Sequence, residues 1–200
     1  MVTKRGTDLK LVGGDPALDF ANTIDGPPDD WSAETLHDYG DLVDWARYAG
    51  VIEDGTAATL AAAAGRDPVE AGRALGRARA ARAAIYVTFR ALASGEAPPG
   101  DALDELRAGY AKALSRARMT DDFEFEWDDD DLDRVLWPLS VAAVDLLRAG
   151  PLDRLKMCAV CRWLFLDASR NHSRRWCSMN ECGGRLKMKR YRARRVTAGR

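Results

Sequence analysis

Apolar residues recur at helical spacing over most of the first three quarters of the chain. The clearest case starts with Pro68 in its first turn and continues to about Ala93, where Leu75, Tyr86 and Phe89 mark apolar sides of one long helix. The same spacing predicts four further helices, over residues 32–48, 55–64, 101–118 and 132–148. The chain is therefore expected to be mostly helical.

Helix boundaries can be expected from capping residues. Ser32 is the expected N-cap of the helix over residues 32–48, and Gly50 suits its end. Pro138 is expected near a kink in the helix over residues 132–148, and Gly150 and Pro151 close that helix. These residues predict where the helices begin, bend and end.

Two segments depart from the helical period. Residues 9–25 begin apolar and are broken by Gly13, Gly14 and Pro16, which predicts a short strand, a turn and a helical turn. Over residues 123–127, aromatic residues alternate with glutamates, which is typical of a half-buried strand. The expected fold class is mainly α with a small β component (α+β): a helical domain over residues 1–153 and a small C-terminal module over residues 154–200.

Length and composition are those of a globular protein. With 200 residues, 46% of them hydrophobic, the chain can bury a core and still carry a smaller module. Its first residues lack the apolar run of a secretory signal, and no stretch of about 18 apolar residues suggests a membrane span. We expect a cytoplasmic protein with no membrane partner.

All four cysteines lie within one eighth of the chain. Cys158 and Cys161 are separated by two residues, Cys177 and Cys182 by four, and fifteen residues lie between the pairs. In a reducing compartment this spacing predicts one structural zinc ion bound by four thiolates. Two alternatives stay open: the cysteines are buried without a metal or form a redox pair, or His172 replaces one of them as a ligand.

The residues from Leu155 to Arg195 resemble the CGNR zinc finger. Its motifs correspond to the paired cysteines, Asp167-Ala-Ser-Arg-Asn171, Arg175-Trp-Cys-Ser-Met179 and Cys182-Gly-Gly-Arg185. Residues 11–23, LVGGDPALDFANT, resemble the start of the ABATE domain, a stress-induced transcription regulator. The resemblance implies a bacterial transcription regulator that binds DNA. Gly184 stands where the CGNR motif has asparagine, so any role of that amide is lost here.

Charge is strongly segregated along the chain. The net charge is −1, but the residues from Lys156 onward carry +11 and the preceding ones −12. This basic end, placed beside a zinc module, predicts DNA contacts. The expected contact residues are Arg170, Arg174, Arg175, Arg185, Lys187, Lys189, Arg190, Arg192, Arg194 and Arg195. A solvated tail, or one that pairs with the acidic first domain or an acidic protein, is the alternative.

The first domain shows no catalytic motif. The chain holds two histidines, His37 and His172, and no nucleophile–base set is apparent, so we expect no enzyme activity. Asp15, Asp19, Asn22 and Thr23 form the densest polar group near the apolar core, and the last three are the candidates for a small-molecule effector pocket. They equally suit capping and bridging of turns. Homodimerisation stays open. The domain and the zinc module are expected to have independent cores.

Overall fold

The computed structural model describes residues 5–25, 33–128, 130–184 and 187–188. In chain order the elements are η1 (Gly6–Asp8), α1 (Pro16–Ala21), β1 (Ile24–Asp25), β2 (Ala33–Glu34), α2 (Tyr39–Tyr48), α3 (Asp54–Arg66), α4 (Pro68–Ala93), α5 (Gly100–Arg116), β3 (Arg118–Met119), β4 (Phe125–Glu126), α6 (Leu136–Ala149), η2 (Leu152–Arg154), β5 (Leu155–Met157), β6 (Leu164–Leu166) and a π-helical turn, η3 (Met179–Gly183). The expected fold class is confirmed.

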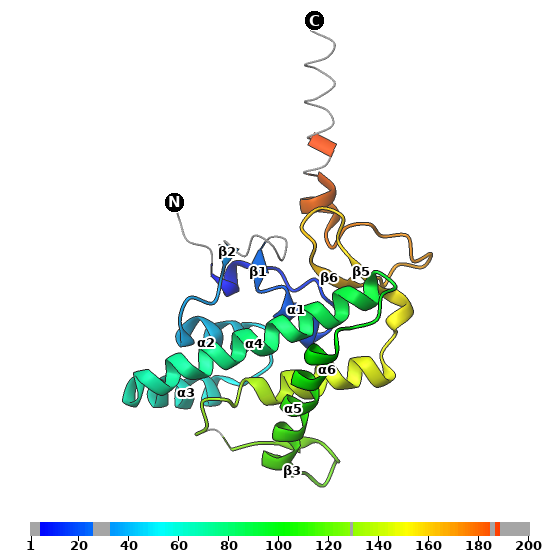
Figure 1. Ribbon diagram of the computed structural model, residues 1–200. Coiled ribbons are helices and arrows are strands. Elements are labelled where there is room, and N and C mark those ends of the chain that lie inside the picture. The colour runs from blue at the N-terminus through cyan, green and yellow to red at the C-terminus, as the bar shows by residue number, and fades with distance from the viewer. Residues whose placement is uncertain (1–4, 26–32, 129, 185–186, 189–200) are drawn as a thin grey trace, which may run out of the picture.

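Helix α4 is the longest element, and other helices pack along it (Figure 1). It begins and ends where the sequence predicts, with Asp67 accepting a hydrogen bond from the N–H of Glu70 as N-cap. Its buried face includes Ile85 and Phe89, which belong to one apolar cluster with residues of α1, α2 and α6. Within the described residues, no helix combines the length and apolarity needed to cross a bilayer.

Two predictions near the N-terminus are wrong: one expected strand does not form, and one expected helix begins later than predicted. No strand forms over Leu9 to Val12, because the carboxylate of Asp19 accepts the N–H groups of Val12 and Gly13 at 2.8 and 2.7 Å. Helix α2 begins at Tyr39 rather than at residue 32, with the carboxylate of Asp38 as its N-cap. Ser32 lies outside the described residues. The positions after it instead form β2, antiparallel to β1.

Later elements are also shorter than expected. Strand β4 covers Phe125–Glu126, and Phe123 lies in the hairpin turn with φ of 67° and 81% of its surface exposed. The sequence could not separate this exposed aromatic residue from a core one. Pro138 lies in the first turn of α6, where a missing N–H breaks no helical hydrogen bond, so the expected kink has no cause.

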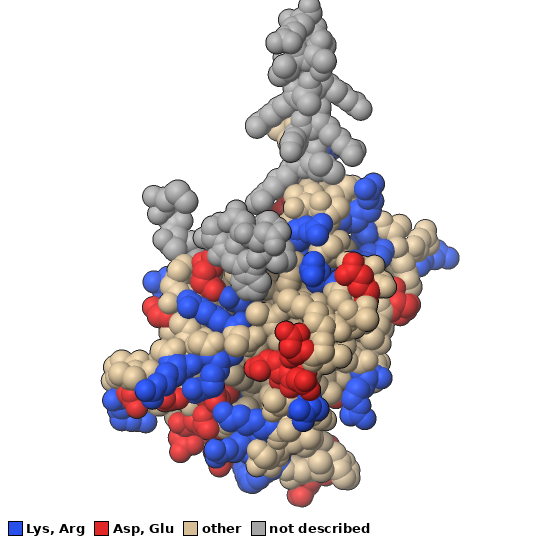
Figure 2. Space-filling view, in the orientation of Figure 1, with Lys and Arg blue, Asp and Glu red and all other residues tan. Residues whose placement is uncertain are grey.

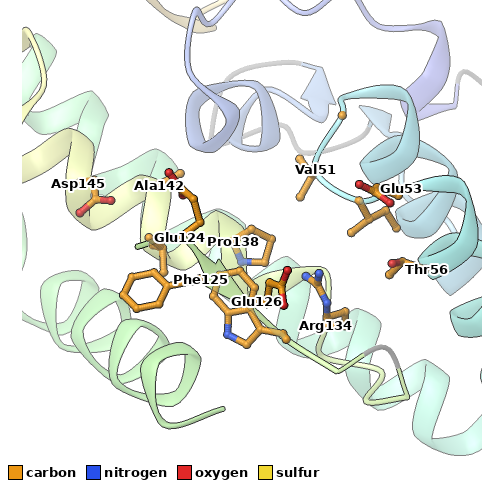
Figure 3. A pocket seen from close by; sticks show the side chains of 14 residues that line it. Val51, Glu53, Thr56, Glu124, Phe125, Glu126, Arg134, Pro138, Ala142 and Asp145 are labelled. Atoms are coloured by element: carbon orange, nitrogen blue, oxygen red, sulfur yellow. The ribbon is translucent and has the colours of Figure 1, made fainter. Parts of the chain in front are cut away.

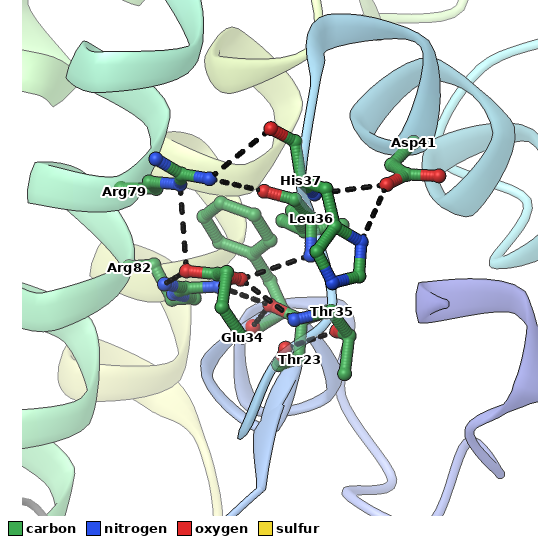
Figure 4. A network of polar contacts seen from close by, with 9 residues as sticks. Thr23, Glu34, Thr35, Leu36, His37, Asp41, Arg79 and Arg82 are labelled. Atoms are coloured by element: carbon green, nitrogen blue, oxygen red, sulfur yellow. Dashed lines mark hydrogen bonds and ion pairs between the residues drawn. The ribbon is translucent and has the colours of Figure 1, made fainter. Parts of the chain in front are cut away.

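A buried ion pair connects β2 to α4 (Figure 4). The guanidinium of Arg82, 1% exposed, donates to both carboxylate oxygens of Glu34 at 2.7 and 2.5 Å. It also donates to the hydroxyl of Thr23 at 3.2 Å. Burial disfavours the charged carboxylate, but the hydrogen bonds and charge of Arg82 outweigh it and lower the pKa of Glu34. This pair fixes the β1–β2 hairpin against the long helix.

The C-terminal module is built onto the helical part. Leu155 and Leu164 belong to the main apolar cluster, and Leu9 belongs to the cluster around the cysteines. Between the two parts, the side chain of Asn22 accepts from the N–H of Leu164 and donates to its carbonyl, both at 2.8 Å. The indole of Trp163 donates to the carbonyl of Ile24 at 3.0 Å. The cysteine module thus has an apolar cluster of its own, as expected, but strands β5 and β6 also join it to the main core.

Candidate metal centre and basic surface

The first cysteine pair lies in the turn between β5 and β6. These strands pair antiparallel, with Met157 opposite Leu164, so the chain reverses through Cys158–Cys161. The N–H of Cys158 donates to the carbonyl of Trp163 at 2.8 Å, and the N–H of Arg162 donates to the carbonyl of Cys158 at 3.1 Å. Both sulfurs are thus presented from one tight hairpin.

The second pair is held by the π-helical turn η3. Ser178 caps it, since its hydroxyl accepts from the N–H of Glu181 at 3.4 Å. Cys182 lies within the turn, and a Cβ on the following Gly183 would come within 2.6 Å of the Met179 sulfur. At Gly184 a Cβ would meet its nearest atom at 3.8 Å, so the backbone there has room for a side chain. Because Met179 is exposed and flexible, its side chain can move away from a Cβ at position 183, so packing does not require glycine at either position.

The four sulfurs converge from these two turns. All lie within 4.8 Å of one another, with Cys161 and Cys177 sulfurs at 3.5 Å and Cys177 and Cys182 sulfurs at 3.8 Å. Zinc–sulfur bonds of about 2.3 Å in a tetrahedron place neighbouring sulfurs about 3.8 Å apart. The arrangement therefore fits one zinc ion with four thiolates. The group consists of the cysteines and does not include His172, so the alternative in which histidine replaces a cysteine is not supported.

The titration of the thiols shows why this cluster needs a cation. A thiolate at Cys158 accepts hydrogen bonds from Cys161 and Cys177, which lowers the pKa of Cys158. The same bonds raise the pKa of Cys161, and the hydrogen bond with Cys158 raises that of Cys177 to about 12. Without a metal, Cys161 and Cys177 therefore stay protonated and share their protons with Cys158 in S–H···S hydrogen bonds. A divalent cation replaces those protons and stabilises all four thiolates.

A buried carboxylate organises the loop between the two cysteine pairs. Asp167, with no exposed surface, accepts from Lys156 at 2.7 Å and from the N–H groups of Ser169 and Arg174 at 2.9 Å each. Lys156 also donates to the carbonyls of His172 and Arg174. Burial opposes the charge of Asp167, but these bonds lower its pKa well below the usual range. The loop is thus held in shape without the metal's direct help.

The contacts of Asp167 described above, the Asp167 clamp, give the arginines of this loop different environments: two are exposed and one has a structural role. Arg170 and Arg175 are exposed. By contrast, Arg174 is half-buried, lies over the Phe165 ring at 4.9 Å and donates to the carbonyl of Cys177. Lys187 is exposed. The remaining predicted contact residues lie outside the described residues: Arg185, Lys189, Arg190, Arg192, Arg194 and Arg195.

The module has exposed basic residues, as has the helical part of the molecule. Figure 2 shows Lys and Arg side chains over the region from which the C-terminal residues continue. A shallow hollow of about 460 Å³ lies there, lined in part by Lys156, His172, Arg174 and Arg175. Trp163 and Trp176 pack against the cysteine cluster, and the Trp163 ring is buried, so it belongs to the core of the module.

The candidate effector residues are engaged within the protein. Asp19 accepts backbone N–H groups of the preceding turn, and Asn22 bridges to Leu164. The hydroxyl of Thr23 donates to the carbonyl of Phe20 at 2.7 Å and accepts from Arg82. All three have buried or largely buried side chains, so the geometry corresponds to the capping and bridging interpretation.

Sequence reasoning missed two residues of the site. In the sequence, Lys156 is one basic residue among many, but in the structure its ammonium group fixes the loop by donating to Asp167. Arg162 follows the cysteine turn with φ of 67°, the left-handed conformation that glycine adopts without strain. The sequence Cys158-Ala-Val-Cys161-Arg has no glycine after its second cysteine, and this absence could have indicated that Arg162 adopts the left-handed conformation. Arg162 takes that backbone position and pays for it in strain.

The strain at Arg162 gives a testable prediction. We expect Arg162→Gly to keep zinc and wild-type stability, whereas Arg162→Val loses about 1–2 kcal/mol, because β-branched residues fit the left-handed region poorly. Urea unfolding of the zinc-loaded variants measures this difference. A valine variant as stable as the glycine variant would show that the turn is not strained.

Two protein-family models match the chain. Residues 14–150 match the ABATE family, described as "Putative stress-induced transcription regulator". Residues 154–195 match the CGNR zinc finger. Both resemblances are thereby confirmed, in the order that the motifs predict, and the second match with the sulfur cluster confirms the zinc prediction. A comparison with curated proteins gave no match.

Proposed function

Because the chain belongs to the ABATE family and carries a CGNR zinc finger, we propose that it is a transcription regulator that binds DNA through its zinc module. Zinc holds the two cysteine turns together, and the Asp167 clamp shapes the loop between them. Exposed basic side chains of that loop contact DNA phosphates, together with the basic residues that follow the last cysteine. The acidic first domain receives a signal or dimerises.

One observation carries the proposal: the module leaves its arginines available. Among the described residues, Arg170, Arg174 and Arg175 form no ion pair with a carboxylate. The alternative function, a module that docks onto the acidic domain of the same chain, would use such pairs. Arg174 is used inside the module by Phe165 and the Cys177 carbonyl, so Arg170 and Arg175 are the arginines available to a partner outside the chain, and the acid-poor sequence that follows Cys182 favours a polyanion.

Phosphate contacts have a recognisable salt dependence. Each contact releases counterions from DNA, so the affinity falls steeply as salt rises, with a slope set by the number of contacts. Base-specific contacts would add discrimination between sequences without changing this slope as much. The salt slope is therefore the measurement that separates a phosphate-binding surface from a structural role of the same arginines.

We predict that Arg170→Gln with Arg175→Gln weakens binding to duplex DNA and lowers the salt slope by about two. Both side chains are exposed, so the zinc module keeps its fold. The matched control is Arg66→Gln with Arg116→Gln, which removes the same charge from exposed positions of α3 and α5. Fluorescence anisotropy at several KCl concentrations gives the slopes.

Two results would contradict the proposal. One is equal salt slopes for the loop variant, the control variant and the wild type. The other is wild-type affinity after removal of residues 185–200, which carry most of the predicted contacts. Zinc content and circular dichroism of each variant establish that the module is intact, so a loss of affinity reports the contacts themselves.

A further inference from the structure

A hollow of the first domain lies where three segments meet, away from the zinc module. It has a volume of about 710 Å³ and is lined by the turn from Gly50 to Thr56, by β4 and by α6 (Figure 3). That volume lies within the range of small-molecule sites in proteins. None of the sequence-predicted effector residues lines it.

The charge of this pocket is one-sided. Four acidic residues line it, Glu53, Glu124, Glu126 and Asp145, against one base, Arg134. Glu126 forms an ion pair with Arg118 at 3.4 Å. Within the described residues, the other three carboxylates form no ion pair. The pocket therefore presents unbalanced negative charge.

The walls between the carboxylates are aromatic and apolar. Phe125 and Trp127 stand two residues apart with ring centroids 6.1 Å from each other, and Val51, Pro138 and Ala142 complete the apolar surface. The guanidinium of Arg134 already lies 5.2 Å from the centre of the Trp127 ring. The Trp127 ring is thus already paired with a cation of the chain, and the partly exposed Phe125 ring is the aromatic surface left for an organic ammonium group.

We propose that this pocket binds a small organic cation with an apolar body, an amine or quaternary ammonium compound. The aromatic and apolar walls hold the body, and one of the rim carboxylates pairs with the positive group: Glu53 on one side of the pocket, or Glu124 or Asp145 on the other (Figure 3). An anion of the same size is repelled by the same rim. Neutral compounds lose the charge attraction and bind more weakly.

The pocket also has a route to the zinc module. Helix α6 supplies Pro138, Ala142 and Asp145 to the pocket and ends at Ala149, after which η2 and β5 lead to Cys158. It packs against α1, whose C-cap Asn22 holds Leu164 in β6. The claim that this pocket receives the signal rests on the proposed function. The claim that it binds an organic cation does not depend on that function.

The test is calorimetric titration of the full zinc-loaded protein with benzyltrimethylammonium, and with benzenesulfonate as an anion of similar body. We expect benzyltrimethylammonium to bind with a dissociation constant below about 1 mM, and benzenesulfonate not to bind. Glu53→Gln with Asp145→Asn should weaken binding about tenfold or more. The matched control, Glu96→Gln with Asp104→Asn, removes the same charge from exposed positions outside the pocket.

Three results would overturn the proposal: no binding of the cation, equal binding of the anion, or equal loss in the pocket and control variants. At 0.15 M salt, charges more than about 8 Å away contribute little, so the control should bind as the wild type does. The titration contains no DNA. Binding of the cation without binding of DNA would support the pocket and contradict the proposed function. Binding of DNA without binding of the cation would support the proposed function and contradict the pocket.

Discussion

Replacing one zinc ligand is expected to destabilise the protein well beyond its C-terminal module. In Cys158→Ser, a fully buried sulfur of the four-cysteine cluster is lost, and with it stoichiometric zinc. Zinc contributes on the order of 10 kcal/mol to the folding of small zinc modules, so even partial loss exceeds the effect of an ordinary core substitution. We expect the midpoint of thermal unfolding to fall by more than about 10 °C.

The effect should spread because the module is not a separate body. Leu155 and Leu164 pack in the main apolar cluster, and Asn22 and Trp163 form hydrogen bonds across the junction. When β5 and β6 lose their zinc-held turn, the amide of Leu164 and the carbonyl of Ile24 lose their partners. Buried polar groups without partners are costly, so the end of α1 should loosen as well.

Three measurements check this prediction. Elemental analysis gives the zinc content, calorimetry gives the unfolding midpoint, and hydrogen exchange reports protection over Pro16–Asp25. The control is Ser173→Ala, an exposed position in the same module, which should keep zinc and the wild-type midpoint. Cys158→Ser with one bound zinc, or with unchanged exchange over Pro16–Asp25, would contradict the shared core.

The sequence predicts the elements of this protein better than their junctions. Helix α4 carries its own signals, Pro68 at the start and a run of good helix formers, so its bounds are local properties. Helix α2 is different. The residues expected in its first turns instead form β2, where Glu34 pairs with Arg82, 48 residues away, and the helix begins only after its N-cap Asp38.

The metal centre shows the same division. Cysteine spacing identifies all four ligands, because each pair must reach one ion through a short turn. The roles of individual arginines and lysines do not follow from their spacing in the sequence. Arg174 and Arg175 are neighbours with the same charge, yet one supports Cys177 and the other faces solvent. The zinc site was therefore predictable, whereas the division of arginines between structure and surface required the fold.

The second large effect is expected from the buried Arg82–Glu34 pair. Arg82→Met should destabilise the protein by about 3 kcal/mol, because Glu34 keeps its charge after losing both guanidinium hydrogen bonds. The carboxylate retains Arg79 at 3.4 Å, which limits the loss. Urea unfolding at neutral pH measures the free energy of unfolding. A loss below about 1 kcal/mol would show that the pair contributes little.

A double variant separates the missing pair from the lost packing. Glu34→Gln with Arg82→Met removes both charges of the buried pair and leaves only the 39% exposed Arg79 without its carboxylate. The double variant should therefore be more stable than the sum of the two single losses allows. Methionine fills much of the space of the arginine stem in both variants. If the double variant loses the full sum, the two residues act independently and the ion pair is not the cause.

The same pair should make stability depend on acid. The pKa of Glu34 is lowered in the folded protein, mainly by Arg82 acting against burial, so its contribution is fully present above the unfolded value of about 4.5. As the pH falls below that value, the unfolded chain takes up the proton first, and the stabilisation is lost as the pH passes through the folded pKa. Arg82→Met removes the cause of the shift. Between pH 5 and 3 the wild type should therefore lose more stability than the variant, and parallel curves would assign the acid sensitivity to other carboxylates.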